Sequence, residues 1–538
     1  MSALILAAAP AHVVMPKVDY LAILPELILL GGAVIVLLAA SVVRGGLKRD
    51  VATGLTLVTG GAALIASIVE WFHVQSHGAS VTIASAISMD SFAAFVAITV
   101  VSTLLIATVI GHAYLVREGI ASTEYHVLAL ASASGAIMMA QANDLVVIFL
   151  ALEILSIALY VLAAFNPLRG ESGEAALKYF LLGGFASAVF VYGIALTYGA
   201  TGSTNLSQIS DFLAKNLPTH TGLLVAGMAL LLVGFAFKVA AVPFHLWTPD
   251  VYQGAPSPVT GYMAAVAKAG AFAGLLRVLL STFGTETATW QPIVYALAAA
   301  SLVVGAISAL PQRNVKRMLA FSSINHTGFI LLGVEAATLA GVGASIYYLF
   351  AYSIMTVGTF GVITMMGGQG DGEHDLSRYR GIARRQPLLG VPFVILLLAQ
   401  AGAPFTTGFL AKFGVVTAAV QAGSWPLAIL AMVTAAIAAY FYLRLAVICV
   451  TPAASERTGD AEAITSGEAD ASAATVRATG ALLLADEEVV AEAAIEQIEI
   501  PTMGVVGVLV ATATTVVFGI VPGPLLDMAH SAADFLTH

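Results

Sequence analysis

Apolar runs long enough to cross a lipid bilayer recur along the whole of this 538-residue sequence. Each run holds about 18 to 25 residues, and about 20 residues of helix span a hydrocarbon core about 30 Å thick. Lipid offers no hydrogen-bond partner to backbone amide and carbonyl groups, so a segment of this length can cross it only as a helix. We therefore predict an all-α polytopic membrane protein that contacts the lipid bilayer.

Composition supports this fold class and excludes others. Hydrophobic residues make up 59% of the chain and charged residues 10%, whereas an average soluble domain carries about 25% charged residues. The chain holds one cysteine, Cys449, but iron–sulfur clusters need sets of cysteines. We expect no cofactor, metal or nucleic acid on this chain, and we interpret Cys449 as a small buried apolar residue.

The apolar runs predict about fourteen transmembrane helices. We place them at residues 20–42, 51–74, 88–112, 124–140, 144–165, 174–200, 222–253, 257–282, 290–310, 316–334, 338–366, 387–421, 425–450 and 501–525. The seventh and twelfth runs are long, and each contains a proline, Pro243 or Pro404. Proline within a helix removes a backbone hydrogen bond, so we predict that helices 7 and 12 are discontinuous.

A short internal match coincides with these two interruptions. Residues 234–238 (GFAFK) resemble residues 408–412 (GFLAK), five helices apart. Interrupted helices in corresponding positions are typical of inverted-repeat transporters, and an odd offset inverts the second copy. We therefore predict two inverted five-helix repeats. The predicted segments are a three-helix segment (1–123), the repeats (124–282 and 283–450), an acidic insert (451–500), and a final helix with its tail (501–538).

Basic residues predict the orientation, because loops on the inner side of a membrane are enriched in lysine and arginine. Alternate loops carry Arg44, Lys48, Arg49, Arg117, Arg169, Arg313, Lys316, Arg317, Arg378, Arg380, Arg384 and Arg385, and Lys215 and Arg277 are the exceptions. We expect both termini to face the outside, which in a bacterium is the periplasm. The insert holds 11 acidic residues and two arginines, so its charge of −9 equals that of the whole chain. We interpret it as a solvated spacer, or alternatively as a docking site for a neighbouring subunit.

Five charged residues fall inside predicted membrane helices. A charge at the centre of a bilayer costs at least about 2.5 to 3.5 kcal/mol, so each is a candidate functional residue. The five are Glu153, Lys178, Lys238, Lys268 and Lys412. Burial disfavours the charged form of lysine and a nearby carboxylate restores it, which suits proton transfer. The alternatives are lysines that extend to the membrane surface, most plausibly Lys178, and a static ion pair at Glu153.

Two histidines and a further glutamate extend the set of candidates. His245 follows Pro243, and His326 lies midway along the tenth predicted helix. Imidazole accepts and donates protons near physiological pH, although either histidine could instead be a hydrogen-bonded packing residue. We interpret Glu26, which follows Pro25, as a capping or interfacial residue, with a lateral contact to another subunit as the alternative.

Several stretches resemble one family of membrane proteins. Residues 234–256 (GFAFKVAAVPFHLWTPDVYQGAP) resemble the signature of the antiporter-like subunits of proton-pumping NADH–quinone oxidoreductase, respiratory complex I. Residues 176–184, 316–328 and 408–413 support this resemblance. Members share fourteen helices, two inverted five-helix repeats and a polar axis at mid-membrane. The lysine at 412 and the opening Leu24–Leu27 are similar to the N type of subunit.

The resemblance also implies residue roles and partners. Glu153 and Lys238 resemble the paired glutamate and lysine of the family, Lys268 and His326 its central relay, and Lys412 its terminal lysine. It implies a non-redox, proton-translocating subunit in a bacterial inner membrane, beside a neighbouring antiporter-like subunit and the small K-type subunit. FMN, iron–sulfur clusters and quinone would belong to other subunits. The alternatives are a subunit of a multi-subunit cation/proton antiporter, and a scaffold whose buried charges only hold helices together.

Overall fold

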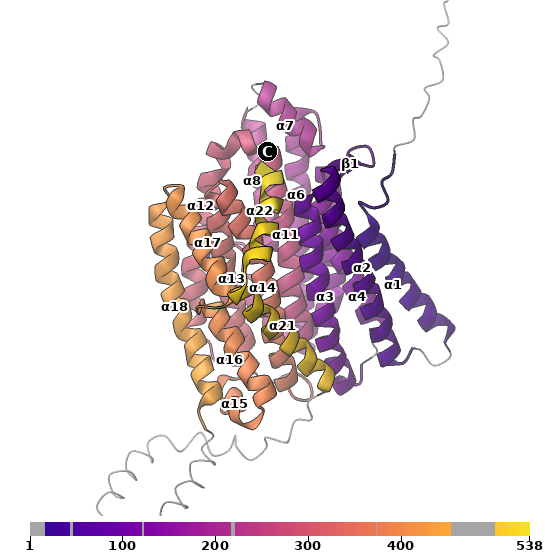
Figure 1. Ribbon diagram of the computed structural model, residues 1–538, viewed down its shortest axis with the longest axis vertical. Helices are drawn as coiled ribbons and strands as arrows, with labels where there is room; N and C mark the ends of the chain where they lie inside the picture. The colour runs from indigo at the N-terminus through magenta and orange to yellow at the C-terminus, as the bar shows by residue number, and fades with distance from the viewer. Residues whose placement is uncertain are drawn as a thin grey trace, which may run out of the picture.

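Nearly all of the described chain forms helices that cross the molecule side by side (Figure 1). The computed structural model describes residues 17–43, 47–120, 123–216, 221–372, 374–452 and 501–537. The N-terminal elements are α1 (Leu24–Val42), α2 (Arg49–His77), β1 (Ser80–Thr82), β2 (Ile87–Met89), α3 (Ser91–Glu118) and α4 (Thr123–Gln141). Strands β1 and β2 form an antiparallel hairpin in which Ser80 lies opposite Met89.

The middle of the chain contains the first interrupted helix. Its elements are α5 (Leu145–Ala163), α6 (Gly170–Thr201), α7 (Leu206–Lys215), α8 (Thr221–Lys238), α9 (Trp247–Gly254), α10 (Ser257–Tyr262), η1 (Met263–Ala267), α11 (Lys268–Leu276), η2 (Arg277–Thr282) and η3 (Gly284–Glu286). The elements from α10 to η2 form one continuous rod that includes two π-helical turns, η1 and η2. Such turns often occur at functional sites.

The C-terminal part contains the second interrupted helix. Its elements are α12 (Thr287–Ala309), α13 (Val315–Glu335), α14 (Leu339–Met366), η4 (Leu376–Tyr379), α15 (Ile382–Arg385), α16 (Pro387–Ala401), α17 (Thr407–Gln421), α18 (Trp425–Val450), α21 (Thr502–Ile520) and α22 (Gly523–Thr537). Helix α21 ends at Ile520, and a separate helix, α22, packs against α14 and α3 and includes residues that we expected to be a tail.

Each of the fourteen predicted runs contains a helix or an interrupted helix. Among the described residues, eleven helices are long and apolar enough to cross a membrane, or twelve if one bent pair counts as a span. Helices α4 and α13 are long enough but less apolar, and α16 and α17 have 15 residues each. The total of fourteen spans and the inverted relation between the repeats stay predictions.

The two predicted interruptions are confirmed. Helix α8 ends at Lys238 and α9 begins at Trp247, with Ala240 in the left-handed region at a φ of 61°. Helix α16 ends at Ala401, where Gly402 has a φ of 98° that glycine adopts without strain. The Thr406 hydroxyl then accepts a hydrogen bond from the Phe409 amide at the start of α17. The first interruption therefore begins among buried residues, whereas the second reaches the surface at Pro404 and Phe405.

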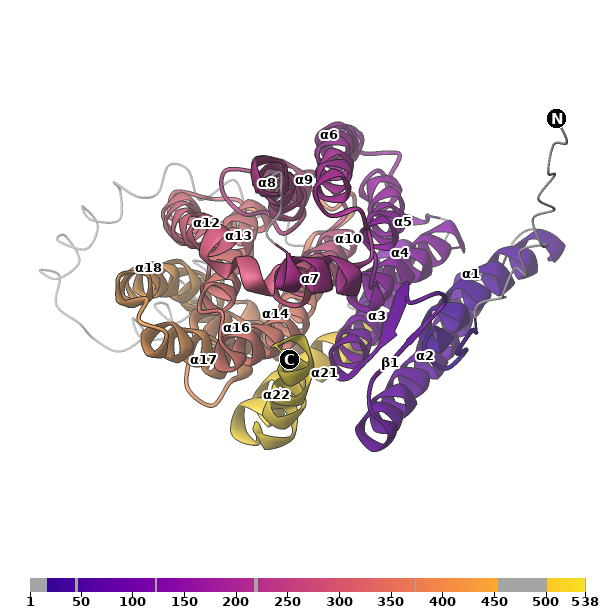
Figure 2. The same ribbon diagram turned by 90° about the horizontal axis from the view of Figure 1, so that it is seen from above.

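Two buried helical rods lie at the centre of the molecule. Helix α14 and the rod from α10 to η2 are almost completely buried, whereas α1 and α2 are mostly exposed. Figure 2 shows α10 and α14 near the middle, with α1 and α2 at one end of the molecule and α17 and α18 at the other. Large apolar side chains on α1, α2 and α6 are exposed, including Leu38, Phe72 and Phe185. Exposed apolar surfaces of this kind are typical of helices that cross a membrane.

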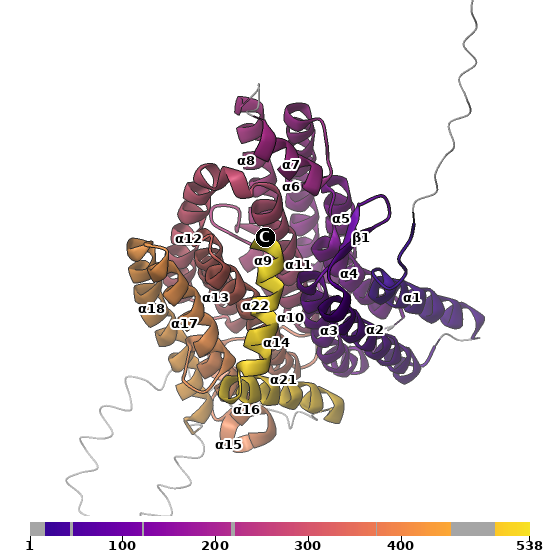
Figure 3. The same ribbon diagram turned by 45° about the horizontal axis from the view of Figure 1, so that its top comes forward.

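The described chain begins and ends on one side of the molecule. Helix α1 starts on the side that carries β1 and α7, and α22 ends on that same side (Figures 1 and 3). This arrangement agrees with the prediction that both termini share a side, while the identity of that side stays a prediction. Cys449 is buried, as we expected. The acidic insert lies outside the described residues from position 453 onward.

The buried carboxylate of Asp371 connects the loop after α14 to the start of the rod formed by α10 to η2. Asp371 accepts hydrogen bonds from the Ser257 amide at 2.8 Å and from the Ser257 hydroxyl at 2.8 Å. Arg169 lies 3.3 Å, His374 3.0 Å and Lys316 3.6 Å from its oxygens. Burial opposes ionisation, but Lys316 and His374 outweigh it and hold the pKa of Asp371 well below its usual range.

Replacing Asp371 with asparagine should destabilise the protein, because the change leaves Lys316 and Arg169 without their buried counter-ion. We expect the free energy of unfolding to fall by about 3 to 5 kcal/mol, measured as a lower melting temperature of the purified complex. A carboxyl with a depressed pKa stabilises the fold above its unfolded pKa of about 3.9 and loses that contribution below it. The wild type should therefore lose stability as the pH falls below about 4 more steeply than the variant.

Asp211→Asn is the matched control, because Asp211 is exposed on α7 and lies 3.8 Å from exposed Lys215. Exposed pairs of this kind contribute little to stability, so its melting temperature should match that of the wild type. A similar melting temperature for the Asp371 and Asp211 variants would contradict the assigned role of Asp371.

Candidate functional site

Three of the predicted lysines are buried at or near the helix interruptions. Lys238 is the last residue of α8, and Lys412 lies in α17 beyond the second interruption. Lys268 begins α11, directly after the π-helical turn η1. Their exposures are 4%, 8% and 3%. All three are therefore shielded from the surroundings of the molecule, and their polar partners decide what each can do.

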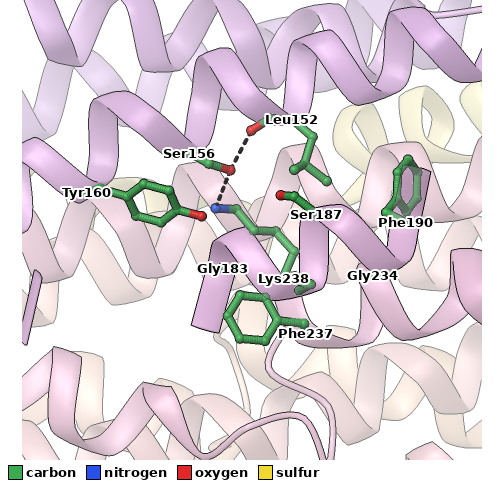
Figure 4. Close-up of a pocket in the computed structure, with 10 residues that line it drawn as sticks. Leu152, Ser156, Tyr160, Gly183, Ser187, Phe190, Gly234, Phe237 and Lys238 are labelled. Atoms are coloured by element: carbon green, nitrogen blue, oxygen red, sulfur yellow. Dashed lines mark hydrogen bonds between the residues drawn. The ribbon is translucent and has the colours of Figure 1, made fainter. Parts of the chain in front are cut away.

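Lys238 is held by neutral oxygens and aromatic rings (Figure 4). Its Nζ donates to the Ser156 hydroxyl at 2.8 Å and to the Tyr179 hydroxyl at 2.9 Å. It also lies 5.0 Å and 5.6 Å from the ring centres of Tyr179 and Tyr160, positions that favour a cation. Within the described chain, no carboxylate lies within 4.0 Å of this nitrogen.

Glu153 lies close to Lys238 without pairing directly with it. The Glu153 side chain accepts a hydrogen bond from the Ser187 hydroxyl of α6, and Ser187 lines the same cavity as Lys238. A cavity of about 10 Å³ lies beside Lys238 and is also lined by Ser156 and by Ser187, the partner of Glu153 (Figure 4). This volume is about the minimum that one water molecule needs. Ser187, which binds Glu153, and Ser156, which binds Lys238, thus line the same cavity, while the pairing of Glu153 with Lys238 stays a prediction.

Lys268 is bound to one turn of α13. Its Nζ donates to the Ser323 carbonyl at 2.7 Å, the Ser323 hydroxyl at 2.6 Å and the Thr327 hydroxyl at 2.8 Å. The Thr327 hydroxyl in turn donates to the carbonyl of Val239 at 2.7 Å. Val239 follows Lys238 and begins the first interruption. The carbonyl freed by that break therefore connects the surroundings of two lysines.

His326 connects to Lys412 through Tyr442 and Gln400. The ring nitrogens of His326 lie 2.7 Å from the Tyr348 hydroxyl and 2.9 Å from the Tyr442 hydroxyl. Tyr442 donates to the side chain of Gln400 at 3.3 Å, and the backbone carbonyl of Gln400 accepts from Lys412 at 2.8 Å. These side chains form a continuous polar row from α13 to α17.

The second interruption creates the partners of Lys412. Its Nζ donates to the carbonyls of Gln400 and Ala401, at 2.8 Å and 2.9 Å. These are the last residues of α16, and the final carbonyls of a helix lack partners within the helix. A cation is favoured at this end by the helix dipole. An unbroken helix would leave no free carbonyls there.

Lys268 and His326 belong to adjoining networks on α13. The Ser323 hydroxyl that contacts Lys268 also accepts from the Tyr352 hydroxyl at 2.7 Å. Ser322, the preceding residue, contacts the hydroxyl of Tyr442, which binds His326. The two networks thus meet at neighbouring serines, but no direct hydrogen bond joins them within the described chain. A proton would need a water molecule or a side-chain rotation to cross this step.

The structure places Lys178 in a different environment from the buried lysines. Its side chain is 43% exposed and pairs with Glu174 at 2.8 Å and Asp250 at 2.9 Å. Asp250 also pairs with Arg317 at 2.7 Å. These residues and Glu171 line a cavity of about 270 Å³, large enough for several water molecules. The exposure of Lys178 agrees with the alternative interpretation, a lysine that extends to the surface.

His245 is also set apart from the row. It lies in the first interruption, between α8 and α9, and is partly buried. Its Nδ1 makes no hydrogen bond within the part of the chain that the structure describes. The geometry therefore offers no contact from His245 to Lys238 or Lys268, and its role stays a prediction.

Sequence reasoning missed the neutral groups of the row. Helical spacing places four polar residues on one side of α13: Ser322, Ser323, His326 and Thr327. This spacing could have predicted that Ser322 and Ser323 lie beside His326. The other missed residues are Ser156, Tyr179, Tyr352, Tyr442 and Gln400. They come from helices far apart in sequence, and serine and tyrosine are common in membrane helices for other reasons.

Comparisons with known proteins agree with this geometry. Residues 142–438 match a family described as NADH:quinone oxidoreductase/Mrp antiporter. NADH-quinone oxidoreductase subunit N of Mycobacterium tuberculosis H37Rv is 43% identical over 425 residues, covering 78% of this chain and 73% of that protein. Subunit N of Acidothermus cellulolyticus is 38% identical over 556 residues, covering 98% and 99%.

Solved structures show the same fold. A chain of respiratory complex I from Thermus thermophilus, solved with bound aureothin, has a TM-score of 0.72 and 32% identity, covering 94% of this chain and 98% of that one. A chain of the Mrp complex from Dietzia has a TM-score of 0.78 at 22% identity, covering 96% and 97%, and shows the fold alone.

The interrupted helices and the buried lysines define an antiporter-like membrane subunit. The sequence comparisons then narrow this class. The chain belongs to the NADH:quinone oxidoreductase/Mrp antiporter family, and within it to the N subunits of NADH–quinone oxidoreductase.

Gly402→Ala should disturb the surroundings of Lys412. A Cβ at this position would lie 3.2 Å from the Lys412 side chain, and the φ of 98° is unfavourable for alanine. Gly423→Ala is the matched control, because Gly423 has a φ of 87° but open space around its missing side chain. Both variants should lose about 1 to 2 kcal/mol of stability from backbone strain, and only Gly402→Ala should lower NADH–quinone oxidoreductase activity. Equal activities would show that Lys412 tolerates the contact.

Proposed function

We propose that this chain is a proton-translocating membrane subunit of a bacterial NADH–quinone oxidoreductase. In this proposal protons pass between Glu153, Lys238, Lys268, His326 and Lys412. The observation that supports it best is a pair of adjoining buried hydrogen-bond networks, one around Lys268 and one that runs from His326 to Lys412. The names of the relatives indicate that the subunit acts in NADH–quinone oxidoreductase.

The partners of the lysines suit reversible proton binding. A buried lysine with a carboxylate counter-ion stays charged, whereas one held by neutral oxygens is close in free energy to its neutral form. Lys238, Lys268 and Lys412 all have neutral oxygen partners. A small change in the local field can therefore make each lysine take up or release a proton.

Glu153 supplies such a change at one end of the row. A carboxylate near a lysine favours the charged form of that lysine, and the hydroxyls of Ser156 and Ser187 line the cavity beside Lys238. If Glu153 moves away or becomes neutral, Lys238 loses that stabilisation and releases its proton. The proton then passes toward Lys268, with Thr327 and the Val239 carbonyl lining that step.

The charged cavity around Lys178 and Asp250 is the proposed site of proton uptake. It is open to the surface, and Lys178 and Tyr179 are consecutive residues of α6. Tyr179 contacts Lys238 directly. Lys178 thus lies at the proposed entrance of the proton pathway. We place this entrance on the inner side of the membrane, where the basic loops lie. We place both termini on the outer side.

The driving energy comes from other subunits. Moving one charge against 100 mV costs about 2.3 kcal/mol, and a chain with one cysteine lacks the ligands for an iron–sulfur cluster. We assign FMN, the iron–sulfur clusters and quinone reduction to other subunits of the complex. We assign a neighbouring antiporter-like subunit and the small K-type subunit as lateral partners.

A cation/proton antiporter subunit is the second candidate function, since the Dietzia Mrp chain has the same fold. Its 22% identity lies well below the 38% to 43% of the N subunits. Purification distinguishes the candidates: flavin and iron–sulfur proteins that copurify with the chain would support NADH–quinone oxidoreductase. Antiport of sodium in vesicles without any dependence on NADH would support the other function.

Lys238→Ala should abolish most proton pumping while the complex still assembles. Loss of a group that transfers protons lowers rates by about 100-fold or more, and proton uptake by NADH-energised vesicles measures the effect. Lys215→Ala is the control, because Lys215 is 72% exposed on α7. Full pumping by the Lys238 variant would refute the relay, and failure of the complex to assemble would indicate a scaffold.

Glu153→Gln tests the proposed electrostatic control. Glutamine keeps the shape and can still contact Ser187, but it removes the charge that acts on Lys238. We expect slower pumping with normal assembly. The control is Asp211→Asn, which changes a 75% exposed carboxylate on α7, and we expect pumping at the wild-type rate there. Wild-type pumping by Glu153→Gln would show that the charge is not needed.

A further inference from the structure

Two buried carboxyl groups lie between α1, α2 and α4, apart from the lysine row. Glu26 is in the first turn of α1 and is 7% exposed, while Glu70 in α2 is fully buried. Within the described chain, none of their four carboxyl oxygens accepts or donates a hydrogen bond. The interpretation of Glu26 as a cap is wrong, because Ile23 is the N-cap residue and no side chain caps α1.

A fifth oxygen without a partner in the described chain lies at the same site. The side chain of Gln141, the last residue of α4, lies beside both carboxyl groups. Its nitrogen donates to the carbonyl of Ala22 at 2.7 Å, and its Oε1 has no partner in the described chain. Gln141 is fully buried. A cluster of buried acceptors without donors is costly unless something supplies a hydrogen.

The charged groups around the pair do not neutralise it. Negative charges on Glu26, Asp90 and Asp19 all act on Glu70. The neighbouring cation is Arg277, whose Nη2 binds Asp90 at 2.8 Å and 3.1 Å. The Nε of Arg277 donates to the Ala140 carbonyl at 2.6 Å. Arg277 is thus paired with Asp90. Glu26 and Glu70 have no basic partner within the described chain.

Two buried carboxyl groups with like-charged neighbours cannot both ionise at low cost, so at least one must hold a proton. The alternative ligand is a metal cation. Calcium takes six to eight oxygens and magnesium needs octahedral coordination, whereas this cluster offers two carboxylates and one amide oxygen. A protonated carboxyl, in contrast, also supplies the donor that the neighbouring oxygens lack.

We propose that Glu26 and Glu70 form a second proton-binding site, which holds at least one proton at neutral pH. The site lies at the end of the molecule formed by α1 and α2, opposite α17, which carries Lys412 (Figure 2). Glu26 lies in the first turn of α1, so the site exchanges protons with the side of the membrane on which α1 begins. The proposal does not depend on the function of the lysine row.

Carbodiimide labelling of the intact purified complex tests this site. Dicyclohexylcarbodiimide reacts with a protonated carboxyl group: the carboxyl proton moves to one nitrogen, the oxygen adds to the central carbon, and the adduct rearranges to a stable N-acylurea. We expect mass spectrometry to find the adduct on Glu26 or Glu70 at neutral pH. Asp90 is the matched control, since it is buried and paired with Arg277, and it should stay unlabelled.

Infrared spectroscopy tests the same site without a requirement for reagent access. The wild-type complex should show a carboxylic C=O band that shifts in D₂O and is absent from Glu26→Gln/Glu70→Gln. Because glutamine resembles a protonated glutamate, this variant should keep its melting temperature, whereas Asp90→Asn, which strands Arg277, should lose stability. Identical infrared bands in the wild type and the double variant would overturn the proposal. Protection from labelling by sodium but not by choline would overturn it in favour of a bound cation.

Discussion

The fold depends on the lack of hydrogen-bonding partners in lipid. Every polar group at membrane depth must find its partner within the protein, and the two interruptions show how the chain meets this demand. The carbonyls of Gln400 and Ala401 at the end of α16 bind Lys412, and the carbonyl of Val239 accepts from Thr327. Each break that would be costly in lipid thus becomes part of a polar site inside the helix bundle.

The same constraint separates two kinds of buried charge. Arg277 and Asp90 pair directly, and Asp371 pairs with Lys316 and Arg169, so these charges are held and fasten helices to one another. The three buried lysines instead bind hydroxyls and carbonyls. Charges of the first kind stabilise the bundle, and we propose that groups of the second kind change protonation. The scaffold and the candidate relay therefore use similar residues in opposite ways.

Much of the fold could be predicted, and less of the site. Helix positions follow from apolar run length, and the interruptions follow from Pro243 and from residues 402–404. The buried lysines stand out because charge is rare in such segments. Their hydroxyl partners could not be found in this way, because Tyr179 and Ser156 come from other helices and serine and tyrosine carry no such signal. The position of Glu26 beside Pro25 suggested that it caps a helix. Its burial as an acidic residue follows from the packing of α1 against α2 and α4, which the sequence does not show.

The sequence by itself determined the class of structure, the places where two helices break and the charges that lie at membrane depth. These properties are local, because the cost of placing a residue in lipid depends mainly on that residue and its near neighbours. Tertiary structure alone decided the environment of each charge. It left Lys178 in an exposed ion-pair cluster, surrounded Lys238 with neutral oxygens, and brought Glu26 and Glu70 together. A charge responds to every group within a few ångströms, and those groups come from helices that only folding assembles.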